Sequence, residues 1–183
     1  MKQQVKMGKL ETVYQGRFIA LKRRQVGFPN GEEKTFEYCE RPDSVTVLPF
    51  DQKGRLLLIK EYRHDHRKSV WFLPAGSRKN NEPPVRAAHR ELREETGFDA
   101  KKLKKLYSRS SGSSIIIWNI HLFAAKDLFL APLKGDEEFP IKVVPTPLKT
   151  AVKMALDGTI ENEFIAYHII RFNELIKSGK FKW

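Results

Sequence analysis

The stretch that decides the fold is GSRKNNEPPVRAAHRELREETGF, which runs from Gly76 to Phe98. Pro83 and Pro84 stand just before a run of helix-forming residues. Proline is tolerated in the first turn of a helix, because the first backbone N–H groups have no partner there. Gly97 follows the run, at the place where glycine commonly ends a helix. The stretch therefore predicts a turn that leads into a short helix.

Three glutamates of this helix, Glu91, Glu94 and Glu95, are spaced so that their carboxylates project from one face. Like charges at this spacing destabilise an isolated helix, so the arrangement needs a compensating cation. Mg²⁺ takes carboxylate oxygens and keeps waters and substrate phosphates as its other ligands, which suits displacement at phosphorus. The alternative is a solvated acidic face on which Arg90 pairs with Glu94. For three glutamates taken alone, the solvated face is the commoner arrangement.

The spacing of the whole stretch favours the metal site. Gly76 is followed after five residues by Glu82, and after seven more by the run from Arg90 to Phe98. This pattern fits every fixed position of the Nudix box, and its seven identities would arise by chance in a chain of this length roughly once in 10⁶. The chain resembles the Nudix hydrolases, which cleave a nucleoside diphosphate linked to another group. The resemblance implies an α/β Nudix fold, with a mixed β-sheet sandwiched between helices and a small N-terminal antiparallel β extension.

The resemblance also implies a metal site with four ligand residues. Glu91 and Glu95 would be the principal Mg²⁺ ligands, with Mn²⁺ as a possible substitute. Glu94 would bind the metal or a metal-bound water, and Ala75 would contribute its backbone carbonyl. Glu82 could bind the metal itself, or it could contact one of the metal ligands without binding the metal. Without either role, its negative charge would still be favourable near a helix N-terminus.

The catalytic residues implied by the resemblance are Glu94, Glu95, Arg90, Glu137 and Glu138. Arg90 is best interpreted as a structural cation that orients the glutamates. The base that deprotonates water often comes, in this subfamily, from an acidic loop before the last strand, where Glu137 is the closest match and Glu138 the next. Both could instead belong to an exposed acidic turn. In that case a glutamate of the box could act as the base, if the metal lowers the pKa of its bound water.

Two neighbouring segments narrow the subfamily. Glu61-Tyr62-Arg63 and Leu73-Pro74-Ala75-Gly76 resemble the corresponding segments of the ADP-ribose and nucleoside diphosphate sugar pyrophosphatases. There, an arginine matching Arg63 binds the diphosphate, for which a planar bidentate donor is well suited. An arginine matching Arg41 can reach the substrate across a dimer interface. Both arginines could instead be surface ion-pairing residues.

The loop after the box departs from the pattern of ADP-ribose-specific relatives. Those relatives carry Ser-Pro-Gly where this chain has Ser110-Ser111-Gly112. The missing proline puts a strict preference for ADP-ribose in doubt and leaves room for other sugars, as in GDP-mannose. We expect Ser111 and Gly112 to face the terminal sugar. His64 and His66 form a His-x-His pattern, but no third soft ligand stands nearby, so we expect exposed loop residues.

Composition bounds the remaining possibilities. The chain has 183 residues, of which 40% are hydrophobic and 31% charged, as in an ordinary globular protein. Its apolar runs are too short to cross a bilayer, and its single cysteine, Cys39, fits a reducing cytoplasm. With 34 basic and 22 acidic residues the formal net charge is +12, which favours polyanionic partners. The basic residues are scattered, however, so nucleic acid is not the expected partner, and we expect no membrane association.

Along the chain we expect two parts, an N-terminal β-hairpin extension over residues 1–42 and a Nudix domain over residues 43–183. In the extension, strands at 19–27 and 34–40 should form a hairpin around Pro29-Asn30-Gly31. In the domain, strands at 44–50 and 55–61 should form a second hairpin. Further strands are expected at 71–73, 103–108, 115–125 and 141–144. Helices are expected at 147–156 and 161–177.

These observations lead to one preferred function and two alternatives. We expect a metal-dependent pyrophosphatase that hydrolyses nucleoside diphosphate sugars to a nucleoside monophosphate and a sugar phosphate. The resemblance implies a homodimer in which the extension contributes to the partner's site. One alternative is an RNA-end or dinucleoside polyphosphate pyrophosphohydrolase, which the basic surface would suit. The other is a non-catalytic nucleotide-sugar sensor, although such modules tend to have lost the carboxylates that this chain retains.

Overall fold

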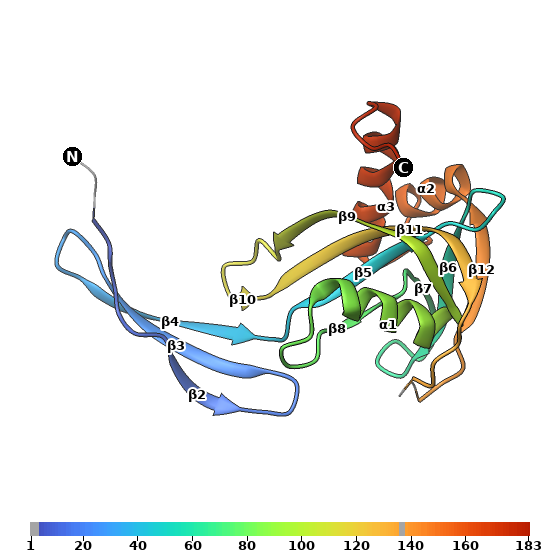
Figure 1. The fold of residues 1–183 in the computed structure, drawn as a ribbon. Coiled ribbons are helices and arrows are strands. Elements are labelled where there is room, and N and C mark those ends of the chain that lie inside the picture. The colour runs from blue at the N-terminus through green and yellow to red at the C-terminus, as the bar shows by residue number, and fades with distance from the viewer. Residues whose placement is uncertain (1–3, 136–137) are drawn as a thin grey trace. The chain divides into compact units, whose positions relative to one another are not determined.

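The computed structural model describes residues 4–135 and 138–183 of the chain. Within it the chain divides into two compact units, whose elements are labelled in Figure 1. The smaller unit comprises Met1–Asp43 and Ser108–Ile120. The larger unit comprises Ser44–Tyr107 and His121–Trp183.

The smaller unit is built on a five-stranded sheet. Its strands are β1 (Lys6–Met7), β2 (Glu11–Gln15), β3 (Ala20–Gly27), β4 (Glu33–Glu40) and β10 (Ile116–Ile117). They run in the order β1-β3-β4-β10, β2 also pairs with β3, and β10 is parallel to β4. The antiparallel pair β3 and β4 confirms the expected hairpin. Its turn contains Gly31 at φ 86°, a conformation that favours glycine.

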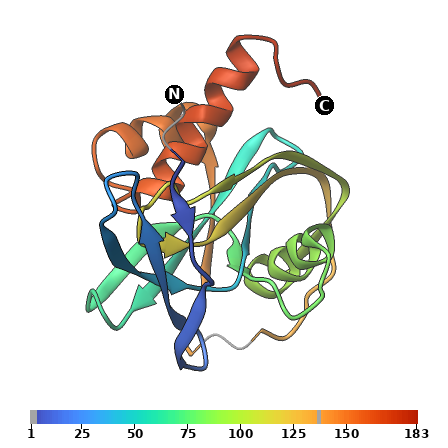
Figure 2. The ribbon, with the colours of Figure 1, turned by 90° about the vertical axis from the view of Figure 1, so that its left-hand side faces the viewer.

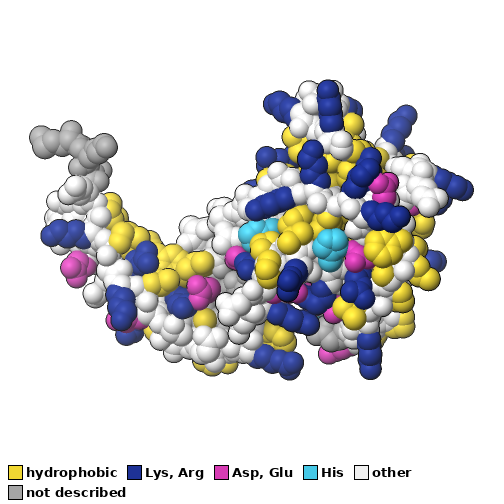
Figure 3. All heavy atoms as spheres, viewed as in Figure 1, with side chains coloured by type: hydrophobic (Ala, Val, Ile, Leu, Met, Phe, Trp, Pro, Cys, Tyr) yellow, Lys and Arg dark blue, Asp and Glu magenta, His cyan; other side chains and the backbone are white. Residues whose placement is uncertain are grey.

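Many apolar side chains of the smaller unit are exposed. They are Val5, Met7, Val13, Tyr14, Phe18, Ile19, Leu21, Phe36, Ile115 and Ile116. Figure 3 shows apolar side chains on this unit among basic ones. So much exposed apolar surface on a small sheet is typical of a surface that binds another chain.

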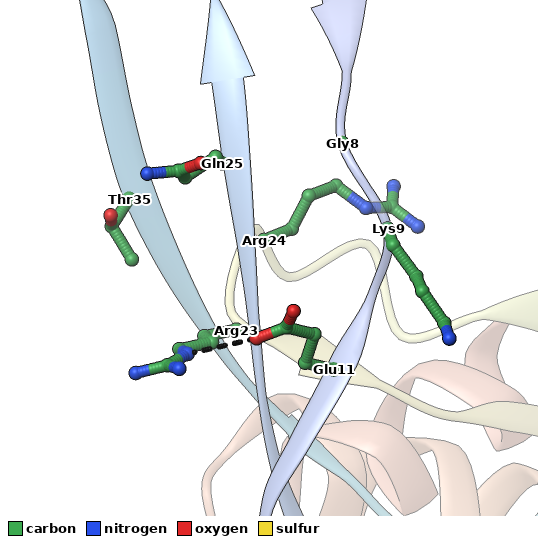
Figure 4. Close-up of a pocket in the computed structure, with 7 residues that line it drawn as sticks. All are labelled: Gly8, Lys9, Glu11, Arg23, Arg24, Gln25 and Thr35. Atoms are coloured by element: carbon green, nitrogen blue, oxygen red, sulfur yellow. Dashed lines mark hydrogen bonds and ion pairs between the residues drawn. The ribbon is translucent and has the colours of Figure 1, made fainter.

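A polar cavity of about 370 Å³ lies in the smaller unit (Figure 4). Its lining residues are Gly8, Lys9, Glu11, Arg23, Arg24, Gln25 and Thr35. Arg23 donates from Nε to Glu11 Oε2 at 3.2 Å. The Arg24 side chain extends from β3 toward the segment that carries Gly8 and Lys9, as Figure 4 shows. The lining therefore has three basic side chains and one acidic one.

The larger unit contains two sheets and three helices. One sheet has the order β8 (Ala75–Ser77), β5 (Ser44–Pro49), β11 (Asn119–Leu130), β9 (Phe98–Ser110). The other has the order β12 (Lys142–Pro147), β6 (Arg55–Arg63), β7 (Lys68–Phe72). The helices are α1 (Pro84–Thr96), α2 (Leu148–Leu156) and α3 (Glu163–Lys177). None of the helices in the described residues has the length and apolar character needed to cross a bilayer.

The four-stranded sheet separates two hydrophobic cores. On one face, Val45 and Val47 of β5 pack with Ala87, Ala88 and Leu92 of α1, together with Phe123 and Ala125 of β11. On the other face, Leu48 of β5 and Leu122 and Ala124 of β11 pack with Ile165, Ile169 and Phe172 of α3 and Ala151 of α2. Successive strand residues point to opposite faces, so β5 and β11 supply both cores. Figures 1 and 2 show α1 on one side of this sheet and α2 and α3 on the other, which confirms the expected fold class.

The prediction that the strands at 44–50 and 55–61 pair with each other as a hairpin is wrong. β5 and β6 follow one another in sequence but belong to different sheets. Between them, Phe50 forms an isolated antiparallel bridge with Leu56, and the Asp51 N–H donates to Arg55 O at 2.9 Å. The turn itself is well formed, because Asp51 Oδ1 accepts from the backbone N–H groups of Lys53 and Arg55. Each strand instead has two other neighbours, and these complete its hydrogen-bond ladder. The strand expected at 115–125 is also divided, into β10 and β11.

The C-terminal segment packs an aromatic cluster onto the second core. The Phe181 ring is 8% exposed and lies 5.0 Å, between centroids, from both Phe172 and Trp183. The Phe181→Ala variant should lose about 3 kcal/mol of unfolding free energy, because it leaves a cavity in a packed cluster. Urea unfolding of the purified chain measures this loss.

The matched control is Leu156→Ala, since Leu156 is 70% exposed. This control should stay within about 0.5 kcal/mol of the wild-type chain. Equal losses in the two variants would contradict the packing described for Phe181.

Candidate active site

Helix α1 is delimited as its sequence predicts. It begins with Pro84 in its first turn, and Gly97 ends it at φ 76°, in the left-handed region. The Gly97 N–H donates to Arg93 O at 3.1 Å and closes the last turn. Because Ala87, Ala88 and Leu92 are buried against the four-stranded sheet, the neighbouring face of α1 carries the glutamates along the edge of the core.

Strand β8 brings the backbone of Ala75 and Gly76 against this helix. β8 pairs antiparallel with β5, with Gly76 opposite Val45 and Ala75 opposite Thr46. A Cβ at Gly76 would lie only 2.2–2.4 Å from the carboxylate atoms of Glu91. A side chain at position 76 would therefore displace the Glu91 carboxylate or β8, whereas glycine leaves that space to Glu91.

Arg90 connects three of the acidic residues. Its Nε and Nη2 donate to the two carboxylate oxygens of Glu82 at 2.9 and 2.8 Å. Its Nη1 donates to Glu91 Oε1 at 2.6 Å and to Glu94 Oε2 at 2.8 Å. Nη2 also donates to the backbone carbonyl of Ser77 at 3.0 Å. The guanidinium thus orients all three carboxylates and ties them to β8.

These charges are mostly buried. The side chains of Arg90, Glu82, Glu91 and Glu94 are 14, 15, 8 and 9% exposed. Hydrogen bonds to Glu82 are the main reason why the pKa of Arg90 lies above its ordinary value, and the nearby Glu91 and Glu94 add to the effect. Hydrogen bonds from Arg90 in turn lower the pKa of Glu82. Arg90 and Glu82 are therefore both charged at neutral pH.

Glu95 makes a separate contact with β8. Its Oε2 accepts from the backbone N–H of Ala75 at 2.9 Å. The structure thus brings together the candidates for the metal site. Glu95 contacts Ala75, Glu91 lies against Gly76, and Arg90 joins Glu91 to Glu94.

The donor atoms at this site are of the type that a hard divalent cation binds. They are carboxylate oxygens, next to the backbone of Ala75, and oxygen ligands are those that Mg²⁺ and Mn²⁺ prefer. In residues 4–135 and 138–183, no three His, Cys, Asp or Glu side chains already form a metal-binding group. Glu91, Glu94, Glu95 and the backbone carbonyl of Ala75 are the groups that would hold such a cation.

The remaining candidates of the larger unit lie at its surface. Arg63 ends β6, where Nη1 lies 3.8 Å from Glu61 Oε1 and Nε lies 3.5 Å from Asp65 Oδ1. Glu138 is exposed, as are both loop histidines, His64 and His66. Glu137 lies outside the residues that the structure describes.

Three other candidates cluster in the smaller unit. The Arg41 guanidinium stacks over the Trp118 ring at 4.3 Å from its centroid. The Ser111 N–H donates to Trp118 O at 2.8 Å, and its hydroxyl donates to Ile116 O at 2.9 Å. Gly112 follows with φ 74°. Sequence reasoning missed Trp118, because no local pattern connects it with Arg41 and only the parallel pairing of β10 with β4 brings the two segments together.

Removal of the shared cation gives a pH-dependent prediction. Arg90→Met should cost about 3 kcal/mol of unfolding free energy at pH 7, because three mostly buried carboxylates lose their partner. The pKa of Glu82 is lowered from an ordinary value of 4.5. Its pairing therefore stabilises the fold above that pH and is lost as the pH falls through the lower, folded-state pKa. Urea unfolding at pH 7 and pH 4 should show the cost of the substitution shrinking at the lower pH.

Arg86→Met is the matched control, because Arg86 is an exposed arginine of the same helix. It should change stability little at either pH. A cost for Arg90→Met that is the same at both pH values would contradict the proposed charge balance.

Comparison with known proteins shows the family of the chain. The model of a family described as NUDIX domain matches residues 40–180. The chain is 29% identical over 174 residues to an ADP-ribose pyrophosphatase of Bacillus subtilis (strain 168), covering 93% of this chain and 94% of the relative. It is 32% identical over 173 residues to a methanol dehydrogenase activator of Bacillus methanolicus, covering 92 and 94%.

A solved structure is similar over nearly the whole chain. The crystal structure of an ADP compounds hydrolase superposes with a TM-score of 0.84 and 27% sequence identity, covering 97% of this chain and 96% of that one. The Gly76–Phe98 stretch, with its glycine against a buried glutamate, lies inside the matched range. This chain belongs to the NUDIX family.

Proposed function

We propose that the protein is a metal-dependent pyrophosphatase that hydrolyses nucleoside diphosphate sugars to a nucleoside monophosphate and a sugar phosphate. The observation that carries the proposal is the set of mostly buried carboxylates on α1 that Arg90 and the backbone of β8 hold in place. Burial of like charges is costly, and a cluster built in this way is typical of a site that binds a cation. The names of the relative from Bacillus subtilis and of the solved structure support the substrate class.

In this proposal Mg²⁺ is the metal, held by Glu91, Glu94, Glu95 and the carbonyl of Ala75. When bound, it neutralises charge on the diphosphate and lowers the pKa of water. Glu95 would stay oriented by the Ala75 N–H, and Arg90 would keep Glu91 and Glu94 in place through its hydrogen bonds. Mn²⁺ has the same preference for oxygen ligands and could replace Mg²⁺.

The chemistry is an in-line displacement at phosphorus. The oxygen of a water forms a bond to one phosphorus, the bond from that phosphorus to the bridging oxygen breaks, and the bridging oxygen leaves with the other phosphate. The water proton goes to a carboxylate, for which Glu138 and Glu137 are the candidates. Arg63 would bind the diphosphate through its planar guanidinium, in place of its present long contacts with Glu61 and Asp65.

The smaller unit supports a role in sugar recognition. Arg41, stacked on Trp118, and the Ser111-Gly112 turn, whose Ser111 N–H donates to Trp118 O, lie in one small region. We propose that this region binds the sugar end of the substrate. The turn has Ser111 where ADP-ribose-specific relatives carry proline, so we expect more than one sugar to be accepted.

We further propose that residues 1–42 form an extension that contacts a second copy of the chain, and that residues 43–183 form the catalytic domain. The exposed apolar side chains of the smaller unit support a homodimer. A reducing compartment such as the cytoplasm is proposed from the single cysteine.

The decisive experiment is a phosphatase-coupled assay with ADP-ribose, GDP-mannose and ADP-glucose, with Mg²⁺ or with EDTA. We expect metal-dependent cleavage of at least one of them. In Glu95→Gln, kcat should fall by about 10³-fold, because one proposed metal ligand loses its charge while its oxygen can still accept from Ala75 N–H. Glu163→Gln, an exposed glutamate on α3, is the control and should retain activity.

If the folded wild-type chain binds sugar nucleotides but cleaves none of them, the enzyme proposal is wrong and a sensor is favoured.

The polar cavity of the smaller unit, with its three basic side chains, favours a second candidate function, which is the hydrolysis of RNA ends or dinucleoside polyphosphates. Cleavage of a triphosphorylated RNA alone, with binding that weakens steeply as salt rises, would favour that candidate.

Gly76 provides a second prediction. In Gly76→Ala the new Cβ would meet the Glu91 carboxylate at 2.2–2.4 Å, so Glu91 or β8 must move. We expect kcat to fall by at least about 10²-fold, since small displacements of a reacting group have effects of this size. The neighbouring exposed Ser77→Ala is the control. Wild-type kinetics in Gly76→Ala would contradict the role given to Glu91.

A further inference from the structure

One edge of the sheet in the smaller unit is interrupted. Along this edge β3 pairs with β1 up to Met7 and with β2 from Glu11 onward, and residues 8–10 lie between the two strands. The Gly8 N–H still donates to Gln25 O at 2.8 Å, and a Cβ at Gly8 would lie only 2.8 Å from the same oxygen. Glycine therefore lets the chain approach β3 closely at the interruption, and the polar cavity of about 370 Å³ lies there.

The lining of this cavity is basic. Lys9 lies in the interruption itself, and Arg23 and Arg24 follow one another on β3. Glu11 is the acidic residue among them, so three positive charges against one negative charge leave a formal net charge of +2. A phosphate monoester carries a charge of about −1.5 to −2 at pH 7. The lining therefore complements the charge of a single phosphate group.

Arg24 has a buried donor that lacks an acceptor. Its Nε is buried, and no residue in the described ranges 4–135 and 138–183 accepts a hydrogen bond from it. A buried donor without an acceptor is costly, and more so when it belongs to a charged group. Figure 4 shows the Arg24 side chain extended from β3 toward Gly8 and Lys9, which line the same cavity. An anion in the cavity would supply the acceptor.

The present partner of Arg23 is easily replaced. Arg23 Nε donates to Glu11 Oε2 at 3.2 Å, and the two side chains are 56 and 54% exposed. Exposed ion pairs contribute little to stability, so Arg23 can exchange Glu11 for an anion at small cost. Gln25 lies opposite Thr35 in the ladder between β3 and β4, on the same face of the sheet as Arg23. Their amide and hydroxyl groups add neutral donors to the lining.

We propose that this cavity binds the dianionic phosphate group of a small molecule, either inorganic phosphate or the terminal phosphate of a phosphate monoester. Arg23 and Arg24 would donate to the phosphate oxygens, for which a planar guanidinium is well suited, and Lys9 would add a point charge. The lining residues belong to the smaller unit and the proposed metal ligands to the larger one, so the two sites share no residue.

The cavity favours a small anion over a nucleic acid. Its volume of about 370 Å³ falls within the range of small-molecule sites, roughly 300–1,000 Å³. A long polyanion is usually bound by basic side chains in a continuous stripe, whereas those of this site are gathered in one cavity together with Glu11. Among the lining residues that the structure describes there is no aromatic ring on which a base could stack. We therefore expect the site to recognise the phosphate and not the group attached to it.

Isothermal titration calorimetry with inorganic phosphate tests the site. The full chain is titrated in EDTA, so that no divalent metal ion can bind phosphate on α1. Arg24→Met should weaken binding by at least about tenfold, because a charge-assisted contact is lost. Arg17→Met, which removes an exposed arginine of the same unit outside the lining, should stay within about twofold of wild type. Equal effects of the two substitutions, or no binding to the wild-type chain, would overturn the proposal.

Glu11→Gln has an expected effect that a folding defect cannot imitate. The substitution releases Arg23 and removes the negative charge from the lining, so phosphate should bind about threefold more tightly. Glu33→Gln is the matched control, because Glu33 is an exposed glutamate of β4 outside the lining, and it should leave the affinity unchanged. A Glu11→Gln chain that binds phosphate no more tightly than wild type would contradict the role given to Arg23.

Parallel titrations with adenosine monophosphate, ribose 5-phosphate and adenosine distinguish the sources of the phosphate. Equal dependence on Arg24 for inorganic phosphate and both esters indicates recognition of the phosphate alone, and dependence for one ester alone identifies that ester as the ligand. Binding of adenosine should not depend on Arg24. If an RNA depends on Arg24 with or without a 5′ phosphate, and its binding weakens steeply as salt rises, the site belongs to a nucleic-acid surface and the proposal is wrong.

Backbone amide NMR spectra locate the bound phosphate. In EDTA, inorganic phosphate should shift the resonances of Gly8 and Gln25, while that of Gly76 on β8 stays in place. Shifts confined to the larger unit would overturn the proposal. None of these measurements requires hydrolysis. A chain that cleaves no sugar nucleotide can still bind phosphate in this cavity, whereas an active chain that binds none there would remove this inference alone.

Discussion

The interaction on which the candidate site depends is the shared guanidinium of Arg90. Glu82, Glu91 and Glu94 are mostly buried and like-charged, so without Arg90 their mutual repulsion and desolvation would oppose folding. One cation cannot neutralise three carboxylates and Glu95. The remaining negative charge is what a divalent cation would compensate in the proposed metal site.

This charge cluster stands on an apolar base. Ala87, Ala88 and Leu92 anchor helix α1 in one core. Strand β5 packs against α1 in this core and contributes to the second core through its opposite face. Because the strand is packed on both faces, β8 and α1 have little freedom to move apart. Preorganisation of this kind is what a site for charge stabilisation requires, since the dipoles and charges need not rearrange during the reaction.

The sequence was most informative where chemistry is local. Pro84 and Gly97 delimit α1 because they restrict or permit particular backbone angles, and the glutamate spacing places three carboxylates on one face. Pairing between distant segments was less predictable. The turn at Asp51 has the sequence of a hairpin turn, yet β5 and β6 pair with other strands. The neighbours of a strand depend on the arrangement of the whole sheet and not on the turn alone. The stacking of Arg41 on Trp118 likewise depends on pairing between segments far apart in sequence, and no single stretch encodes it.

The alternation of β5 has a consequence for how such a protein can change during evolution. Val45 and Val47 face one core, and Leu48 faces the other. Val45 also pairs with Gly76 in the ladder between β5 and β8. Insertion or deletion of a single residue here would exchange the two faces and shift the glycine away from Glu91. Length variation in descendants of this chain should therefore be confined to the turns, whereas β5 tolerates only replacement of one side chain by another of similar volume.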